Sequence, residues 1–353
     1  METVGTTFAT SDFPQQRYRD NFARHVLGVT LYMESTIMGR LRDNFGHSGL
    51  RLSFEPYMTM AARGDVRLSD MADMLAISRQ AANQTANQIE TAGYLRRSAD
   101  SRDGRAKLLV ATDQGMALIR DGAIEAERLE NQLCELAGAG AIATAQASLL
   151  TLCEQLALLP RYQLELASEL NLAALLPRLA NWINNELMDL ARDRGHPHLK
   201  PNFGQVLTAI GPDGGRIQQI ARAQNVSKQA ISTIVARLEA LGYLERVSDP
   251  LDARQQVLHF TAYGRQLIRD AVASLDELRA RLAGIIGDDA LAQLEDTLAQ
   301  LYRSLNPEGE VFTDASGDIG NLADDLLQQL GAQGAAALAE HLLLLTHAQR
   351  TTA

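Results

Sequence analysis

One pattern of apolar and polar positions occurs twice along this chain, at a constant offset of 149 residues. Segments Ser78–Gly115 and Ser227–Gly264 align without a gap and share 14 identical pairs in 38 positions, which is far more than chance gives. In each copy, apolar residues first recur every three to four positions, which predicts a helix with one buried face. Two short strand-like runs around a polar turn follow. A repeat of this kind predicts two copies of one structural unit.

The residues at the ends of these runs set the boundaries of the predicted elements. Ser78 and Ser227 are suited to cap a helix N-terminus, and Gly93 and Gly242 to end that helix in the left-handed conformation. A short amphipathic helix and a tight turn precede each serine. The order is therefore helix, turn, helix, strand, polar hairpin, strand. This is a helix-turn-helix with a wing, in which the second helix fits the major groove of DNA and the hairpin reaches the backbone or the minor groove.

Three motifs make the chain resemble the MarR family of winged-helix transcription regulators. They are the serine that begins the second helix, Glu90-x-x-Gly93-Tyr94-Leu95 at its exit, and Asp100-Ser101-Arg102-Asp103-Gly104-Arg105 in the wing, which matches the family's D-x-R-D-x-R pattern. The second copy departs from it, with Leu251 in place of the first arginine. The resemblance implies a mainly α fold of tandem winged helix-turn-helix domains, with long flanking helices that form an intramolecular pseudo-dimer. It also implies a bacterial, cytoplasmic regulator of transcription.

We expect three regions in the chain. Residues 1–159 hold the first MarR-like repeat, 160–305 the second, and 306–353 an acidic linker with C-terminal helices. Pro160 leaves little slack between the repeats, so we expect them to pack through their flanking helices within a monomeric chain, because these helices would otherwise expose apolar faces. The C-terminal helices have no counterpart in the first repeat. They either cover apolar helix surface or regulate the protein.

Polar side chains lie opposite the buried stripe of each second helix, where bases would be read. Asparagine and glutamine pair with adenine, and arginine or lysine with guanine, so the first repeat favours sites that contain adenine. The wing arginines suit a narrow minor groove, and we expect Asp100 or Asp103 to hold one of them by a charge-assisted hydrogen bond. An ordinary solvated helix face is the alternative. The predicted DNA-binding residues are Ser78, Arg79, Gln80, Asn83, Gln84, Asn87, Arg102, Arg105, Lys228, Gln229, Ser232, Thr233 and Arg254.

The charge distribution distinguishes the two repeats. The formal net charge of the chain is −10, which by itself disfavours DNA. Segment 307–353 contributes −6 of this, whereas segment 78–107 carries +3 and its counterpart 227–256 carries 0. Since local charge governs attraction to phosphates, we expect the first repeat to bind DNA more strongly. Two unlike reading surfaces also predict an operator that is not a perfect palindrome.

The resemblance further implies a small aromatic or anionic effector, bound between the helical region and a winged helix. Five residues in flanking segments are candidates to line its pocket, with ordinary packing or surface roles as the alternative. They are Tyr32, Arg51, Tyr57, Trp182 and Lys200. No cofactor is expected. His196-x-His198 could bind a metal, but in a Gly/Pro turn we interpret it as a solvated loop and predict no metal site.

Cys134 and Cys153 lie among leucines at core spacing. We interpret them as buried helical cysteines, with a redox-sensing pair, known in some relatives, as the alternative. Residues 136–153 carry no charge over 18 positions, but the counterpart 285–302 contains four acidic residues, so we reject a membrane span. Met1–Thr10 lacks the apolar run of a signal sequence.

Two other functions compete with DNA-dependent regulation. A Gly-rich phosphate loop, a nucleophile elbow and a metal-binding helix pair are all missing from the sequence, so we do not expect an enzyme. The main rival is a protein-interaction or DNA-mimicking module with degenerate winged helices, which the acidic balance favours and the intact first wing opposes. A one-headed regulator, in which the second repeat serves as partner and sensor, is the third possibility.

Overall fold

A computed structural model describes residues 14–64, 66–75, 77–100, 107–159, 170–211, 214–223, 226–248 and 256–307. Its first repeat comprises α1 (Gln15–Arg19), α2 (Phe22–Phe45), the 3-10 turn η2 (Leu52–Phe54), α3 (Glu55–Arg63), β1 (Val66–Arg67), α4 (Leu68–Met74), α5 (Arg79–Thr91), β2 (Leu95–Ala99), β3 (Lys107–Ala111), α6 (Asp113–Ala137) and α7 (Ala139–Gln155). The second comprises α9 (Leu172–Asp193), α10 (Phe203–Ala209), α11 (Ile217–Ala223), α12 (Lys228–Ala240), β4 (Leu244–Ser248), β5 (Gln256–Phe260), α13 (Ala262–Ile286) and α14 (Asp288–Leu305). The fold is mainly α, with a tandem pair of winged helix-turn-helix units.

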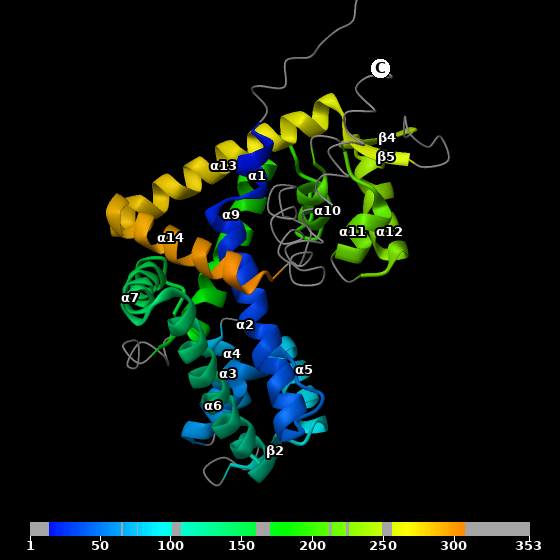
Figure 1. Ribbon diagram of the computed structural model, residues 1–353. Coiled ribbons are helices and arrows are strands. Elements are labelled where there is room, and N and C mark those ends of the chain that lie inside the picture. Colours follow the sequence, from blue (N-terminus) through cyan, green and yellow to red (C-terminus); the bar gives the residue numbers. More distant parts are fainter. Residues whose placement is uncertain are drawn as a thin grey trace, which may run out of the picture.

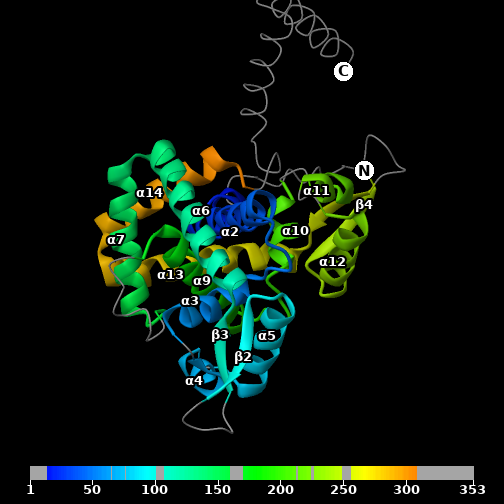
Figure 2. The ribbon, with the colours of Figure 1, turned by 90° about the horizontal axis from the view of Figure 1, so that it is seen from below.

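Two small winged-helix units, which we call the heads, project from a common helical body (Figures 1 and 2). The first head contains α3, α4, α5 and strands β1 to β3, and the second contains α10, α11, α12, β4 and β5. In the first head the strand order is β1-β3-β2, with Leu95 opposite Ala111. The second head pairs β4 with β5 in the same register, Leu244 opposite Phe260, and the bridge from Gly215 to Leu258 takes the place of β1.

The helix ends predicted by the repeat are confirmed. The Ser78 hydroxyl accepts a hydrogen bond from the Ala81 amide at 3.1 Å, and the Ser227 hydroxyl accepts one from the Ala230 amide at 3.1 Å. Gly93 and Gly242 have φ angles of 85° and 79°, in the left-handed region that ends a helix at low steric cost. The sequence Thr-x-x-Gly at the start of the next helix is also repeated, as Thr112–Gly115 and Thr261–Gly264. Its glycine is required by packing, because a Cβ on Gly115 would lie 2.1 Å from the carbonyl oxygen of Tyr94.

The flanking helices of both repeats share one apolar core in the body. Helix α2 packs against α9 and α14, and α7 packs against the same two helices from another side. Leucines from both repeats are completely buried there, including Leu149, Leu175 and Leu298. Helix α1 also crosses to the other repeat, where the Gln15 side chain donates to the Ile210 carbonyl at 2.5 Å. Burial of these faces therefore joins the repeats over long sequence separations.

Within the described residues, no single helix is long and apolar enough to cross a membrane. The combination of α6 and α7 meets the length and composition criteria, but the two helices meet at a bend of 115°. Both cysteines are free thiols, Cys134 partly exposed and Cys153 buried.

The Cys153 thiol is expected to resist a thiol-specific disulfide reagent in the native chain at pH 7. It is 0% exposed, and burial raises its pKa to about 11, so only on the order of one molecule in 10⁴ carries the reactive thiolate at neutral pH. Reactivity should rise about tenfold per pH unit as the pKa is approached. The measurement is chromophore release from the Cys134→Ser variant, native and denatured. Rapid native reaction would contradict this prediction and favour the redox interpretation.

Candidate nucleic-acid interface and effector cavity

Helix α5 presents a polar face to solvent in the first head. Its buried side is formed by Ala82, Ala86 and Ile89, each with no exposed area. The predicted reading residues Arg79, Gln80, Asn83, Gln84 and Asn87 are all exposed, and Ser78 serves as the N-cap of the helix. The fold therefore brings the candidates of this head together on one face, with the helix dimensions that the major groove admits.

Arg97, on strand β2, organises this face and was missed as a site residue from the sequence. Its guanidinium donates to Glu90 Oε2 at 2.7 Å, to Asn83 Oδ1 at 2.9 Å and to Asn87 Oδ1 at 2.7 Å. Arg97 thus holds the side-chain amides of Asn83 and Asn87 in place. It occupies one acceptor site on each amide oxygen and leaves both NH₂ groups able to donate hydrogen bonds. The sequence did mark this position, because both repeats have arginine there, Arg97 and Arg246. It could not show which residues the arginine contacts, since these depend on how the wing packs against the helix.

The second head presents a different surface. On α12, Lys228, Gln229 and Thr233 are exposed, and Ser232 is partly buried. Arg246 repeats the contact with the helix glutamate, Nε to Glu239 Oε1 at 2.9 Å. Ser232 and Ala236, however, stand where the first head has its two asparagines, so the bridged amide pair belongs to the first head.

The charge difference between the heads lies mainly on the wing strands. Arg96 on β2 and Lys107 on β3 are exposed, and neither has an ion-pair partner among the described residues. Their counterparts at the repeat offset are Glu245 and Gln256, which are also exposed. The first wing therefore has two cations that suit contact with DNA phosphates, whereas the second wing has the anion Glu245 and the amide Gln256 at the same positions.

Strand β1 contributes an ion pair that we did not predict from the sequence. Arg67 Nε donates to Asp100 Oδ2 at 2.8 Å, and Asp100 is only 6% exposed. Our expectation that Asp100 or Asp103 holds a wing arginine stays a prediction, because residues 101–106 lie outside the described part of the chain. A hollow of about 400 Å³ beside this pair is lined by Arg67, Leu68, Ser69, Asn83, Arg97 and Lys107. The predicted wing residues Arg102, Arg105 and Arg254 lie outside the described residues, as does Asp103.

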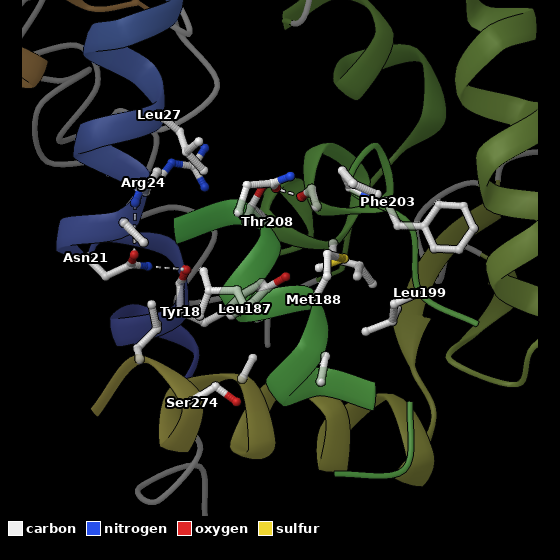
Figure 3. Close-up of a pocket in the computed structure, with 18 of the residues that line it drawn as sticks. Tyr18, Asn21, Arg24, Leu27, Leu187, Met188, Leu199, Phe203, Thr208 and Ser274 are labelled. Carbon is white, nitrogen blue, oxygen red and sulfur yellow. Dashed lines mark hydrogen bonds between the residues drawn. The ribbon is translucent and has the colours of Figure 1, made fainter. Parts of the chain in front are cut away.

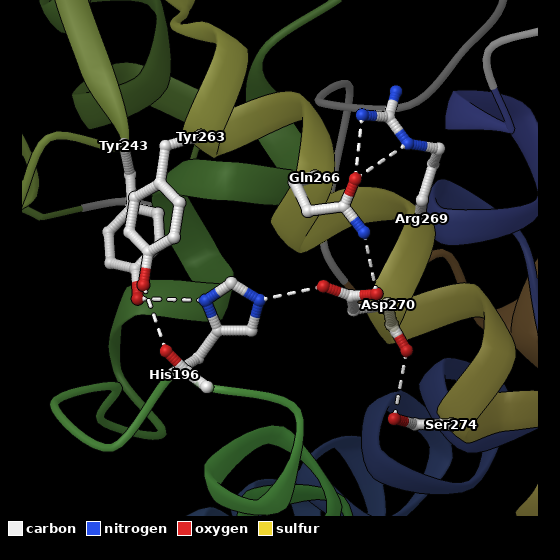
Figure 4. Close-up of polar contacts among 8 residues, drawn as sticks. His196, Tyr243, Tyr263, Gln266, Arg269, Asp270 and Ser274 are labelled. Atoms are coloured by element: carbon white, nitrogen blue, oxygen red, sulfur yellow. Dashed lines mark hydrogen bonds and ion pairs between the residues drawn. The ribbon is translucent and has the colours of Figure 1, made fainter.

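A buried histidine joins the second head to the helical body (Figure 4). His196 follows the end of α9 and is 2% exposed, so the interpretation of its turn as solvated is wrong for this residue. Its Nε2 lies 3.0 Å from Asp270 Oδ2 on α13, and its Nδ1 lies 3.1 Å from Tyr243 Oη at the start of the wing. Burial raises the pKa of Tyr243, which keeps this phenol a hydrogen-bond donor.

The first repeat carries the same three residue types at the same offset: His47, Asp121 and Tyr94. His47 Nε2 lies 2.9 Å from Asp121 Oδ2, and the His47 and Tyr94 rings are 5.7 Å apart. We call each set the His–Asp–Tyr network. In each set, the histidine follows one body helix (α2 or α9), the aspartate lies on another (α6 or α13), and the tyrosine directly precedes the first strand of the wing. No cluster of His, Cys, Asp and Glu within the described residues could hold a metal ion.

A cavity of about 620 Å³ lies between the body and the second head (Figure 3). Its apolar walls come from α2, α9, α10 and α13, with Leu27, Leu187, Met188, Phe203 and Leu207 among them. Tyr18, Asn21 and Arg24 reach it from the first repeat, and Lys200, Thr208 and Ser274 from the second. The cavity is therefore assembled by both repeats.

One of the five predicted effector residues, Lys200, lines this cavity, and the other four lie elsewhere. Tyr32 Oη accepts from Gln132 in the body, and Tyr57 is buried in the first head, where it donates to the Ala82 carbonyl. Trp182 lies under the Arg281 guanidinium at 5.1 Å, and Arg51 precedes η2 on the surface. Tyr18, Asn21 and Arg24 were missed, because nothing local in the sequence places the first repeat against the second head.

The two capped recognition helices, each with a strand hairpin behind it, define the class of winged-helix transcription regulators. The model of the MarR family matches this chain twice, at residues 58–106 and 203–255, so the chain contains two MarR-type domains.

Three solved structures illustrate the similarity. The transcriptional regulator Tm0710 from Thermotoga maritima is 24% identical, with a TM-score of 0.30, over 37% of this chain and 91% of that one. A MarR-family regulator from Rhodococcus sp. RHA1 is 25% identical, with a TM-score of 0.31, over 37% and 92%. CouR from Rhodococcus jostii RHA1, bound to p-coumaroyl-CoA, is 25% identical, with a TM-score of 0.31, over 40% and 95%. No curated protein matches the chain.

Proposed function

We propose that this chain is a sequence-specific double-stranded DNA-binding regulator, acting as a ligand-responsive repressor with two unlike heads in one chain. The observation that carries the proposal is the pair of capped helices with solvent-exposed polar faces, α5 and α12, held by one shared body. The body would act as an intramolecular pseudo-dimer, so that one chain presents the two DNA-binding heads that a dimer of two protomers would present. Residues 1–159 and 160–305 are the proposed halves, and a cytoplasmic location follows from access to the genome.

Its effector would be a small molecule with an apolar body and an anionic group. The cavity beside the second head is mostly apolar, and its charged lining residues are the cations Arg24 and Lys200. Its volume lies in the range of small-molecule sites. Binding there would act on the turn that attaches the second head.

The function is tested by binding to a pool of genomic DNA fragments at two salt concentrations. We expect tight, sequence-selective binding that weakens with salt and is lost in the Arg102→Ala, Arg105→Ala variant. The bound sequences should have two unlike half-sites, since Asn83 and Asn87 are replaced by Ser232 and Ala236 in the second head. A perfect palindrome would refute the unlike heads. Absence of binding at low salt would favour the acidic protein-interaction module instead.

A further inference from the structure

We propose that the chain takes up a single anionic effector, in the cavity beside the second head, and that the corresponding place beside the first head is closed by an internal ion cluster. This inference rests on the ligand response proposed above. It differs from the expectation for a symmetric pair of domains, which would offer two equivalent sites.

The charge of the cavity favours an anion. Arg24 and Lys200 contribute positive charge, and none of the described lining residues is a carboxylate. Arg24 is held at the wall because its Nε donates to Tyr302 Oη at 2.9 Å. Burial raises the pKa of the lining Tyr18 to about 12, so its phenol stays neutral at physiological pH. An anionic group at this wall would therefore be attracted by the described cations Arg24 and Lys200.

The wall residue Ser274 has a very different counterpart in the first repeat. Ser274 is small, and its hydroxyl donates to the Asp270 carbonyl of its own helix at 2.9 Å. At the repeat offset stands Glu125, which is 0% exposed. Glu125 Oε1 lies 2.6 Å from Arg128 Nη1, and Oε2 lies 3.6 Å from Arg40 Nη1. The longer side chain fills space between α2 and α6, and it already neutralises part of the positive charge of the two arginines that an incoming anion would need.

The cation at the cavity wall is not repeated either. Asn21 caps α2 and Asn171 caps α9 in the same way, each accepting from the amide three residues later. That residue is Arg24 in α2 and Ala174 in α9. Lys200 does have a basic counterpart, Arg51. The residues that would correspond to α1 fall in 160–169, outside the described part of the chain.

The cavity is coupled to the attachment of one head. Leu199, Lys200 and Pro201 line it and belong to the same turn as His196. His196 bonds to Tyr243 of the second head and to Asp270, which lies one helical turn before the wall residue Ser274 (Figure 4). An effector would therefore act on the His–Asp–Tyr network of the second head and leave that of the first head untouched.

Titration with a matched pair of fluorescent probes tests the proposal. The anionic probe is 8-anilinonaphthalene-1-sulfonate, and N-phenyl-1-naphthylamine has the same apolar body without the sulfonate. We expect one tightly bound sulfonate probe per chain. The Arg24→Gln, Lys200→Gln variant should weaken its binding by about tenfold or more, as expected for the loss of a charge-assisted contact, and should change binding of the neutral probe by less than about twofold.

Two further variants complete the test. Ser274→Glu, which introduces the side chain of the first repeat, should abolish binding of the sulfonate probe, and Arg51→Gln is the matched control that should leave it unchanged. Two equivalent sites per chain, equal losses in Arg51→Gln and Lys200→Gln, or no specific binding of the sulfonate probe would each overturn the proposal. DNA binding is measured without either probe, so failure of the single-site proposal is distinguishable from failure of the proposed regulator.

Discussion

The Arg96→Glu, Lys107→Gln variant is expected to bind DNA about 100-fold more weakly than the natural chain at moderate salt. These changes give the first wing the residues that the second wing carries, Glu245 and Gln256. Arg96 and Lys107 are exposed on adjacent strands, where they can contact the phosphate backbone. If each makes one phosphate contact, the slope of log K against log salt should fall by about 1.8. Fluorescence anisotropy with a labelled operator over a salt series measures both quantities.

The reciprocal variant provides the internal comparison. Glu245→Arg with Gln256→Lys gives the second wing the charges of the first, and should raise affinity and steepen the salt dependence. Gln293→Glu with Arg303→Glu changes the net charge by the same amount as the first variant, but on α14 in the body, and should have a much smaller effect. Equal losses from the body and wing variants would mean that total charge, and not the first wing, controls binding.

The His196→Ala variant is expected to lose about 3 kcal/mol of unfolding free energy. The substitution leaves the Asp270 carboxylate and the Tyr243 phenol without the partner they share, and it opens space in a buried site. Losing a charge-assisted hydrogen bond costs about 1.5–3 kcal/mol, and an unsatisfied buried group adds to this. Urea unfolding monitored by circular dichroism gives the midpoint and slope for each variant.

The neighbouring His198 is a matched control for this experiment. It is exposed in the same turn, so His198→Ala should change the unfolding free energy by no more than about 0.5 kcal/mol. His47→Ala removes the equivalent residue of the first repeat and should destabilise the chain to a similar extent. If His196→Ala were as stable as His198→Ala, the His–Asp–Tyr network would not hold the second head to the body.

The order of elements within each repeat could be predicted from the sequence because its signals are local. A serine before an apolar stripe, a glycine at a left-handed turn and a polar hairpin between two strand-like runs each act within a few residues. The repeat then confirmed each signal independently, as Ser78 with Ser227 and Gly93 with Gly242. The exposed polar face of α5 could be predicted as well, since it lies opposite the buried stripe of Ala82, Ala86 and Ile89.

Contacts within a head were only partly predictable. The pairing of Arg67 with Asp100 and the bridge from Arg97 to the two asparagines depend on how the wing strands pack beside the helices. Both arginines recur at the repeat offset, as Arg216 and Arg246. The sequence thus marked the arginines, whereas the tertiary structure decided their partners, because a guanidinium can reach several carboxylates and amides from one backbone position.

The sequence by itself determined that there are two winged-helix units, the order of elements within each, and the unequal charge of their second helices and wings. Only the tertiary structure placed Tyr18, Asn21 and Arg24 of the first repeat against the second head, buried His196 between head and body, and left one cavity wall with Ser274 where its counterpart has Glu125. The physical reason is the range of the interactions. Caps and periodicity act along the chain, whereas the cavity forms between residues more than 150 positions apart, which meet only when both repeats bury their apolar helix faces in one core.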